Sequence, residues 1–77
     1  MSYSDLQIDQ IITAAFWFRC GRFGDDKDYA IVEGRITRLM DCYKRIQIEV
    51  IKTLSGRYPG QSVWVDYEKA VDISINK

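Results

Sequence analysis

An alternation of apolar and polar side chains runs through residues 29–54 and limits what this chain can fold into. The apolar parity holds Ala30, Val32, Gly34, Ile36, Ile46, Ile48 and Val50, and the polar parity holds Glu33, Arg35, Thr37, Arg45, Gln47 and Glu49. Alternate side chains of a strand face opposite sides of a sheet, so this pattern predicts half-buried strands over 29–40 and 44–54. Because the two segments are adjacent, we expect them to form a hairpin.

The parity of these strands also predicts the turn between them. Both inward sets fall on even-numbered positions, so the numbers of opposed residues must sum to an even value. This excludes a two-residue turn and favours three or five residues. A loop over 41–43 pairs Met40 with Lys44, and it places Arg35 opposite Glu49 as a favourable cross-strand pair.

The N-terminal segment has the spacing of a helix. Ser4 or Asp5 can cap a helix through the side-chain oxygen. Apolar residues then recur at three- and four-residue spacing, at Ile8, Ile11, Ile12 and Ala15. We therefore expect a helix over 4–15. Three consecutive aromatic residues follow and favour a strand over 16–23, with a helix that continues to Cys20 as the alternative.

The rest of the chain reads as turns and short strands. Residues 24–28 are polar and rich in residues that tolerate turns, so we expect a loop there. Pro59 followed by Gly60 is typical of a type II turn, in which glycine supplies the positive φ. Alternation over 63–67 and 71–75 predicts two further strands. The expected elements are one helix and five strands.

These elements predict a mainly β (α+β) fold in a single domain over 1–77, since 77 residues leave room for one core. We expect an N-terminal helix followed by a five-stranded, strongly bent antiparallel sheet or a small SH3-like barrel. Bending reduces the exposed sheet edges, and Gly34 stands where a sharp bend favours a residue without a side chain. An open sheet with the helix across one face is the alternative.

A resemblance to a known family rests on three segments of the chain and on the apolar strand that follows them. The segments are Gly34–Ile36, Asp41–Tyr43 and Val65–Ala70, and the whole region spans residues 34–75. In these segments the chain resembles the Sm-like proteins, and in particular the Hfq-like RNA chaperones of bacteria. The resemblance implies an N-terminal helix, five bent strands and a ring-shaped homo-oligomer that binds RNA. It also implies that Tyr43 helps to form a base pocket and that Glu68 and Lys69 occupy positions that contact RNA.

The composition argues against catalysis and metal binding. The chain has no histidine, so acid–base chemistry near neutral pH requires another group with a strongly shifted pKa. Cys20 and Cys42 alone do not complete a four-ligand zinc site. We expect no enzyme activity, no catalytic residue, no metal and no cofactor. Neither a secretory leader nor a run of about 20 apolar residues is found, which predicts a cytoplasmic protein without membrane contact.

Positive charge gathers in the middle of a chain whose net charge is zero. Residues 35–57 hold six basic and two acidic residues. With nearby tyrosines they form a candidate platform for phosphates and stacked bases. The candidate nucleic-acid-binding residues are Arg35, Arg38, Tyr43, Lys44, Arg45, Arg57, Tyr58 and Lys69.

Exposed apolar side chains provide a second lead. Trp64 falls on a parity otherwise filled by polar residues, and Ile31 and Ile51 also lie on nominally outward positions. With Tyr43 they are the candidate partner-binding residues, since apolar patches mark contact surfaces. The alternative is that the predicted N-terminal helix covers this face. The preferred interpretation is a small non-enzymatic interaction module. It would act by protein–protein contact, with a homo-oligomer expected, as small regulators and inhibitors of bacteria or their phages do.

Two other functions stay open at this point. The first alternative is an Sm-like protein that binds RNA or single-stranded nucleic acid. The second is sequestration of a small anionic ligand between subunits.

Overall fold

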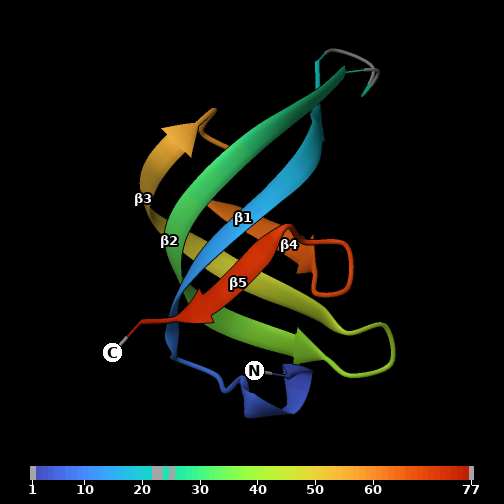
Figure 1. Ribbon diagram of the computed structural model, residues 1–77, viewed down its shortest axis with the longest axis vertical. Coiled ribbons are helices and arrows are strands. Elements are labelled where there is room, and N and C mark those ends of the chain that lie inside the picture. Colours follow the sequence, from blue (N-terminus) through green and yellow to red (C-terminus); the bar gives the residue numbers. More distant parts are fainter. Residues whose placement is uncertain (1, 22–23, 25, 77) are drawn as a thin grey trace.

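Five antiparallel strands form the sheet in residues 2–21, 24 and 26–76, which are the residues that the structure, a computed structural model, describes (Figure 1). The strands are β1 (Ile11–Cys20), β2 (Asp26–Met40), β3 (Arg45–Gly56), β4 (Ser62–Asp66) and β5 (Asp72–Ile75). Their order in the sheet is β4-β3-β2-β1-β5. Consecutive strands from β1 to β4 are therefore neighbours, and the last strand returns to pair with β1.

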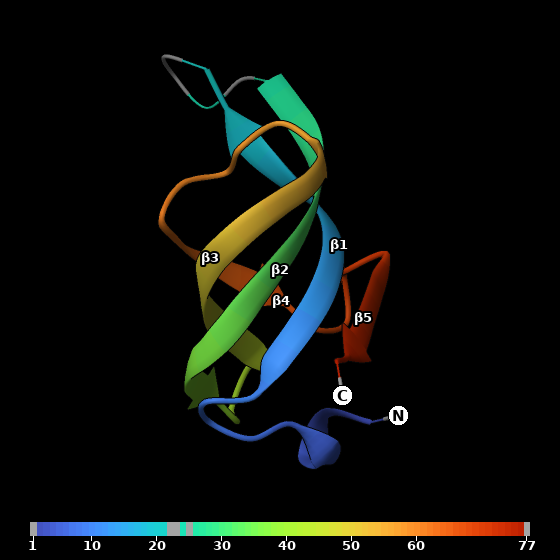
Figure 2. The ribbon, with the colours of Figure 1, turned by 90° about the vertical axis from the view of Figure 1, so that its left-hand side faces the viewer.

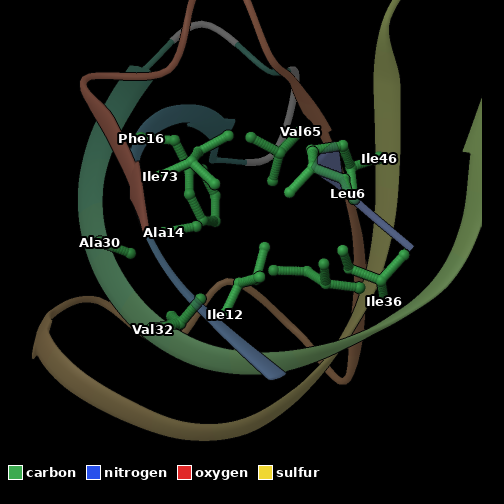
Figure 3. Packing of buried hydrophobic residues seen from close by; sticks show 11 residues of the cluster. Leu6, Ile12, Ala14, Phe16, Ala30, Val32, Ile36, Ile46, Val65 and Ile73 are labelled. Carbon is green, nitrogen blue, oxygen red and sulfur yellow. The ribbon is translucent and has the colours of Figure 1, made fainter. Parts of the chain in front are cut away.

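The sheet curves around an apolar core to which every strand contributes (Figure 3). The residues that point into it from the five strands are Ile12, Ala14, Phe16, Ala30, Val32, Ile36, Ile46, Ile48, Val65 and Ile73. Leu6, from the N-terminal segment, completes the cluster. The even parity predicted to face inward on β2 and β3 is confirmed, because Ala30, Val32, Gly34, Ile36, Ile46 and Ile48 are all buried and Val50 is half-buried.

The predicted helix over 4–15 is wrong. Only a 3-10 turn, η1 (Tyr3–Asp5), forms there, and β1 begins at Ile11. Asp9 adopts a left-handed φ of 71°, which breaks any helix at that point. The Gln10 carbonyl then accepts the Ile36 N–H at 2.9 Å, so pairing with β2 begins where a helix would have continued. A spacing that suits a helix is overridden here by a distant strand.

No helix among the described residues is long and apolar enough to cross a membrane.

The start of β1 also corrects two neighbouring predictions. The strand expected over 16–23 begins five residues earlier, and the alternative of a helix continuing to Cys20 is wrong. The loop expected over 24–28 is shorter, because β2 begins at Asp26 and its first residues already pair with β1. The part of these predictions that falls on residues 22, 23 and 25 lies outside the described residues.

The β2–β3 hairpin pairs Arg35 with Glu49 as predicted, but its turn differs from the predicted one. Its turn has four residues, 41–44, not three, and it pairs Met40 with Arg45. Lys44 takes a positive φ of 51° to close it. A β-bulge then leaves Thr37 without an opposed residue, which restores the even sum and places Arg35 opposite Glu49 as predicted.

Bulges and a glycine allow the sheet to bend. The register of β3 shifts twice more, so that Leu54 and Ile51 are each an extra residue against β2. Such bulges increase twist and curvature, and both views show a strongly coiled sheet (Figures 1 and 2). At Gly34 a Cβ atom would lie 2.9 Å from the Glu49 carbonyl oxygen. The backbones of β2 and β3 approach more closely there than a side chain permits.

The sheet remains open. Its edge strands β4 and β5 pair with β3 and β1 respectively, and within the described residues they do not pair with each other. The two strands predicted over 63–67 and 71–75 are confirmed as β4, which begins and ends one residue earlier, and β5, which begins one residue later. Gly60 has the positive φ expected of it, at 119°.

Replacement of Gly34 by alanine tests the close approach of β2 and β3. Because the φ of Gly34 is not in the left-handed region, alanine meets no backbone strain, and its cost comes from the close contacts with Glu49 and Ile48. We expect Gly34→Ala to lower the free energy of unfolding by about 1–3 kcal/mol, measured by urea denaturation. Ser74→Ala, at an exposed site on β5, is the control and should change it by less than about 0.5 kcal/mol. Equal stability of both variants would show that the strands are not closely packed at Gly34.

Candidate binding groove between the edges of the sheet

Half of β1 has a neighbour on one side only. β1 pairs with β2 from Ile11 to Cys20, whereas β5 covers β1 only from Ile12 to Ala15. Figure 2 shows β5 beside one part of β1, with the remainder of that strand running on beyond it. We call Phe16–Cys20 the free edge of β1. β4, at the other margin of the sheet, likewise pairs only with β3 among the described strands.

The connection from β4 to β5 joins these two edges at one end. The Lys69 and Ala70 N–H groups donate to the Asp66 carbonyl oxygen at 3.1 and 2.9 Å, which folds the chain into a tight turn. The Val71 N–H then donates to the Ala15 carbonyl oxygen at 2.8 Å. The connection is therefore anchored to β1 immediately before the free edge begins.

Two adjoining open hollows, of about 420 and 640 Å³, lie along the free edge of β1. Both are lined by Trp17, Phe18, Arg19 and Lys69. The smaller one reaches Trp64 and Arg45, on β4 and β3, and the larger one reaches Lys27 on β2. Together they form what we call the edge groove.

Two exposed indoles lie in the edge groove. Trp17 is 60% exposed and its ring lies 5.0 Å from that of Tyr29 on β2, centroid to centroid. Trp64 is 42% exposed and stands opposite Gln47 on β3. Of the two alternatives left open for Trp64, the structure shows the exposed one, and no helix covers this side chain in the described part of the chain. Large aromatic rings held on strands offer contact area at little cost in conformational entropy.

Four basic side chains line the same groove: Arg19, Lys27, Arg45 and Lys69. Arg19 stands directly opposite Lys27 in the β1–β2 ladder, and like charges in such positions repel. No ion pair joins any of the four to another described residue. Arg45 instead lies over the Tyr43 ring, 6.0 Å from its centroid. Asp66 is the acidic residue that lines the smaller hollow.

The basic residues predicted for nucleic acid do not form one surface. Arg35 lies between Asp9 and Glu49 and hydrogen-bonds to both, with 3.3 Å to Glu49. The bonds to Glu49 and then to Asp9 raise the pKa of the Arg35 guanidinium above its ordinary value. Two other predicted cations also form ion pairs, Lys44 with Glu68 at 3.2 Å and Arg57 with Asp28 at 3.7 Å. Of the predicted set, Arg45 and Lys69 line the groove, while Arg38, Tyr43 and Tyr58 are exposed elsewhere.

The predicted partner-binding residues are also dispersed. Trp64 lines the groove. Ile51 is the extra residue of a bulge on β3 and is 54% exposed, whereas Ile31 is half-buried on β2 opposite Ala15. Tyr43 is 70% exposed in the turn between β2 and β3. The structure therefore supports Trp64 as a groove residue and leaves the other three outside the groove.

Three groove residues were missed by the sequence reasoning: Trp17, Arg19 and Lys27. Trp17 and Arg19 fall within the strand predicted over 16–23, for which the prediction assigns no outward face, and Lys27 falls within the loop predicted over 24–28. An alternation from Ile12 through Ala14 and Phe16 was the available signal, because it places Trp17 and Arg19 on the outward parity.

The described residues show no metal centre, since no three cysteine, aspartate or glutamate side chains gather in a way that would hold an ion. Cys20 and Cys42 are free thiols, half-buried and exposed respectively. The edge groove itself offers three means of interaction, namely the faces of its aromatic rings, its positive charges and the unpaired strand edges beside it.

Comparisons with protein-family models, curated proteins and solved structures give no match to this chain. The resemblance to Sm-like proteins accordingly rests on the residues that carry it. What the fold itself defines is a small, open, antiparallel β-sheet protein with an aromatic and basic groove at its edges.

The charge of the groove is testable by quenching of tryptophan fluorescence. Because four basic side chains line the groove that holds both indoles, iodide should quench the fluorescence about twofold more efficiently than caesium at equal ionic strength. Because the chain has two tryptophans, Trp64→Phe leaves Trp17 as the fluorophore and Trp17→Phe leaves Trp64. The paired change Arg19→Gln with Lys27→Gln should abolish the excess at Trp17, whereas Arg38→Gln, outside the groove, should leave it. Equal quenching by both ions would contradict a cationic groove.

Proposed function

We propose that this protein is a small non-enzymatic interaction module, a regulator or inhibitor that acts by protein–protein contact, and that its partner docks in the edge groove. The observation that carries the proposal is the position of Trp17 and Trp64. These are two exposed indoles that line one groove, where two sheet edges are also unpaired.

The physical argument is that two kinds of unsatisfied surface coincide. Exposed tryptophans have apolar area to bury, and aromatic anchors contribute much of the binding energy in protein interfaces. Unpaired strand edges present N–H and C=O groups that a second polypeptide satisfies. A protein partner can bury the two indoles and hydrogen-bond to the unpaired backbone groups in the same complex. The expected homo-oligomer stays a prediction, and light scattering on the purified protein shows whether a second copy is itself a partner.

A random peptide display library tests the proposal without assuming a ligand. Peptides selected on the wild-type protein should bind the Trp17→Ser, Trp64→Ser double variant at least about tenfold more weakly, because the two aromatic anchors are lost. Both indoles are exposed, so the fold should survive, which circular dichroism and thermal unfolding check.

Tyr58→Ser is the matched control, because Tyr58 is an aromatic residue of similar exposure, 59%, outside the groove. Peptides that bind wild type, control and double variant equally would show that the groove is not the docking site.

A second candidate is the binding of RNA or single-stranded nucleic acid, as the Sm-like resemblance implies. The observation in its favour is that four basic side chains without ion pairs to described residues lie beside two indoles, since such binding combines cations with stacking rings. Lys69, one of the positions implied by the resemblance, is among the four. Glu68, the other, is engaged with Lys44.

Titration of a short oligothymidylate at several salt concentrations tests this candidate. If phosphates occupy the groove, the affinity should fall steeply with salt, and Lys69→Gln should reduce the slope of log affinity against log salt by about 0.7. Lys52→Gln, a cation outside the groove, should not change the slope. Weak binding with the same slope for all three proteins would exclude the groove as a nucleic-acid site.

A further inference from the structure

We infer that the segment captured by the edge groove is an acidic, extended peptide that adds to the free edge of β1 as a further strand. This inference rests on the proposed function and specifies its partner. Three observations carry it, namely the direction of the backbone groups along β1, the charges that flank the free edge, and the apolar side chains beneath it.

The backbone groups of the free edge point into the groove. The Ile11 and Ala15 carbonyl oxygens accept the Asn76 and Val71 N–H groups, so these odd-numbered residues face the side of β5. The Gln10 carbonyl oxygen faces β2, where it accepts the Ile36 N–H. Because alternate residues of a strand direct their backbone groups to the same side, Trp17 and Arg19 present both N–H and C=O groups where β5 is absent.

An added strand would meet different side chains on its two faces. On the outward face it would lie beside Trp17 and Arg19, with Lys27 one strand further. On the inward face it would lie beside Phe16, which is buried, and Phe18, which is half-buried, with ring centroids 6.0 Å apart. Directly opposed and diagonal neighbours are within reach across a strand pair. The peptide that fits alternates acidic with apolar residues.

Charge strengthens the case for acidic residues. Arg19 and Lys27 repel each other in the ladder, and Lys69 lines the same hollow. A carboxylate placed among these three groups converts a repulsive arrangement into an attractive one. The four ion pairs of the described structure join other residues, so these cations are not engaged by them.

A peptide fits this edge better than a nucleic acid does. Phosphate oxygens accept hydrogen bonds but donate none, so phosphate contacts alone would leave the Trp17 and Arg19 carbonyl groups without donors. A peptide backbone supplies both partners, as in other cases of strand addition. Asp66 lines the smaller hollow, and it disfavours a continuous polyanion more than a peptide whose carboxylates alternate with apolar residues. The net charge of the chain is zero, so no long-range field draws a polyanion to it.

The test uses a short fluorescent peptide in which glutamate and valine alternate, with anisotropy as the measurement. A second peptide carries lysine in place of glutamate. We expect the glutamate peptide to bind at least about tenfold more tightly than the lysine peptide. The basic side chains of the groove attract each carboxylate of the first peptide and repel each lysine of the second. Arg19→Gln and Lys27→Gln should each weaken binding about threefold to fivefold. Arg38→Gln and Lys52→Gln, outside the groove, should leave it unchanged.

N-methylation of the peptide separates strand addition from simple charge attraction. Methyl groups on one alternate set of amides remove the donors that face β1, and binding should be lost. Methyl groups on the other set should leave the affinity within about twofold, because those amides face away from the sheet. Equal effects of the two sets would overturn strand addition. Equal affinity for glutamate and lysine peptides would overturn the acidic partner, as would tighter binding of oligothymidylate at the same charge.

The failures of the two proposals are distinguishable. If library peptides require Trp17 and Trp64 but are neither acidic nor sensitive to N-methylation, the docking function stands and the inference about the partner falls. If no peptide requires the two tryptophans, the proposed function falls as well. Sedimentation of the protein with and without the glutamate peptide adds one more outcome. A homodimer that the peptide dissociates would identify a second copy as the occupant and would overturn the inference.

Discussion

The pairing of β1 with β2 over ten residues is the constraint on which the rest of the structure depends. It draws residues 11–15 into a strand, and it fixes which side chains of β1 reach the core. It also makes β1 longer than its other neighbour, because β5 has only four residues. The free edge of β1 is therefore a consequence of unequal strand lengths. The edge groove exists because the sheet is long on one side of β1 and short on the other.

The parts of the fold that could be predicted are those encoded locally. β2, β3, β4 and β5 follow from alternation within a few residues and from turn residues between them. The prediction of an N-terminal helix failed because two patterns overlap. Ile8, Ile11, Ile12 and Ala15 have the spacing of a helix, while Ile12, Ala14 and Phe16 have the alternation of a strand. Only the distant β2 chooses between them. The bulge at Thr37 had no local signal either, yet without it a four-residue turn would oppose Arg35 to a different residue.

The candidate site was predictable to a smaller extent. Trp64 stood out because it broke the polar parity of its strand, but the sequence did not decide between exposure and coverage by the predicted helix. The basic residues of the hairpin were misleading as a nucleic-acid surface, because acids from outside the predicted hairpin neutralise several of them in addition to the predicted Arg35–Glu49 pair. Asp9 reaches Arg35 from the N-terminal segment and Asp28 reaches Arg57 from the start of β2. Counting charges along a sequence cannot show such pairs, since they depend on the register of strands far apart in the chain.

The same charges that favour an acidic strand also protect the free edge. An unpaired strand invites a second copy to pair with it, and charged side chains are a common way to prevent this. Two copies that met along their β1 edges would bring Arg19 and Lys27 of each copy together, and like charges at such short range repel. An acidic strand meets no such cost. The cross-strand pair of like charges is unfavourable in the isolated protein. In the proposed complex the same pair disfavours a second copy along this edge and favours a strand of opposite charge.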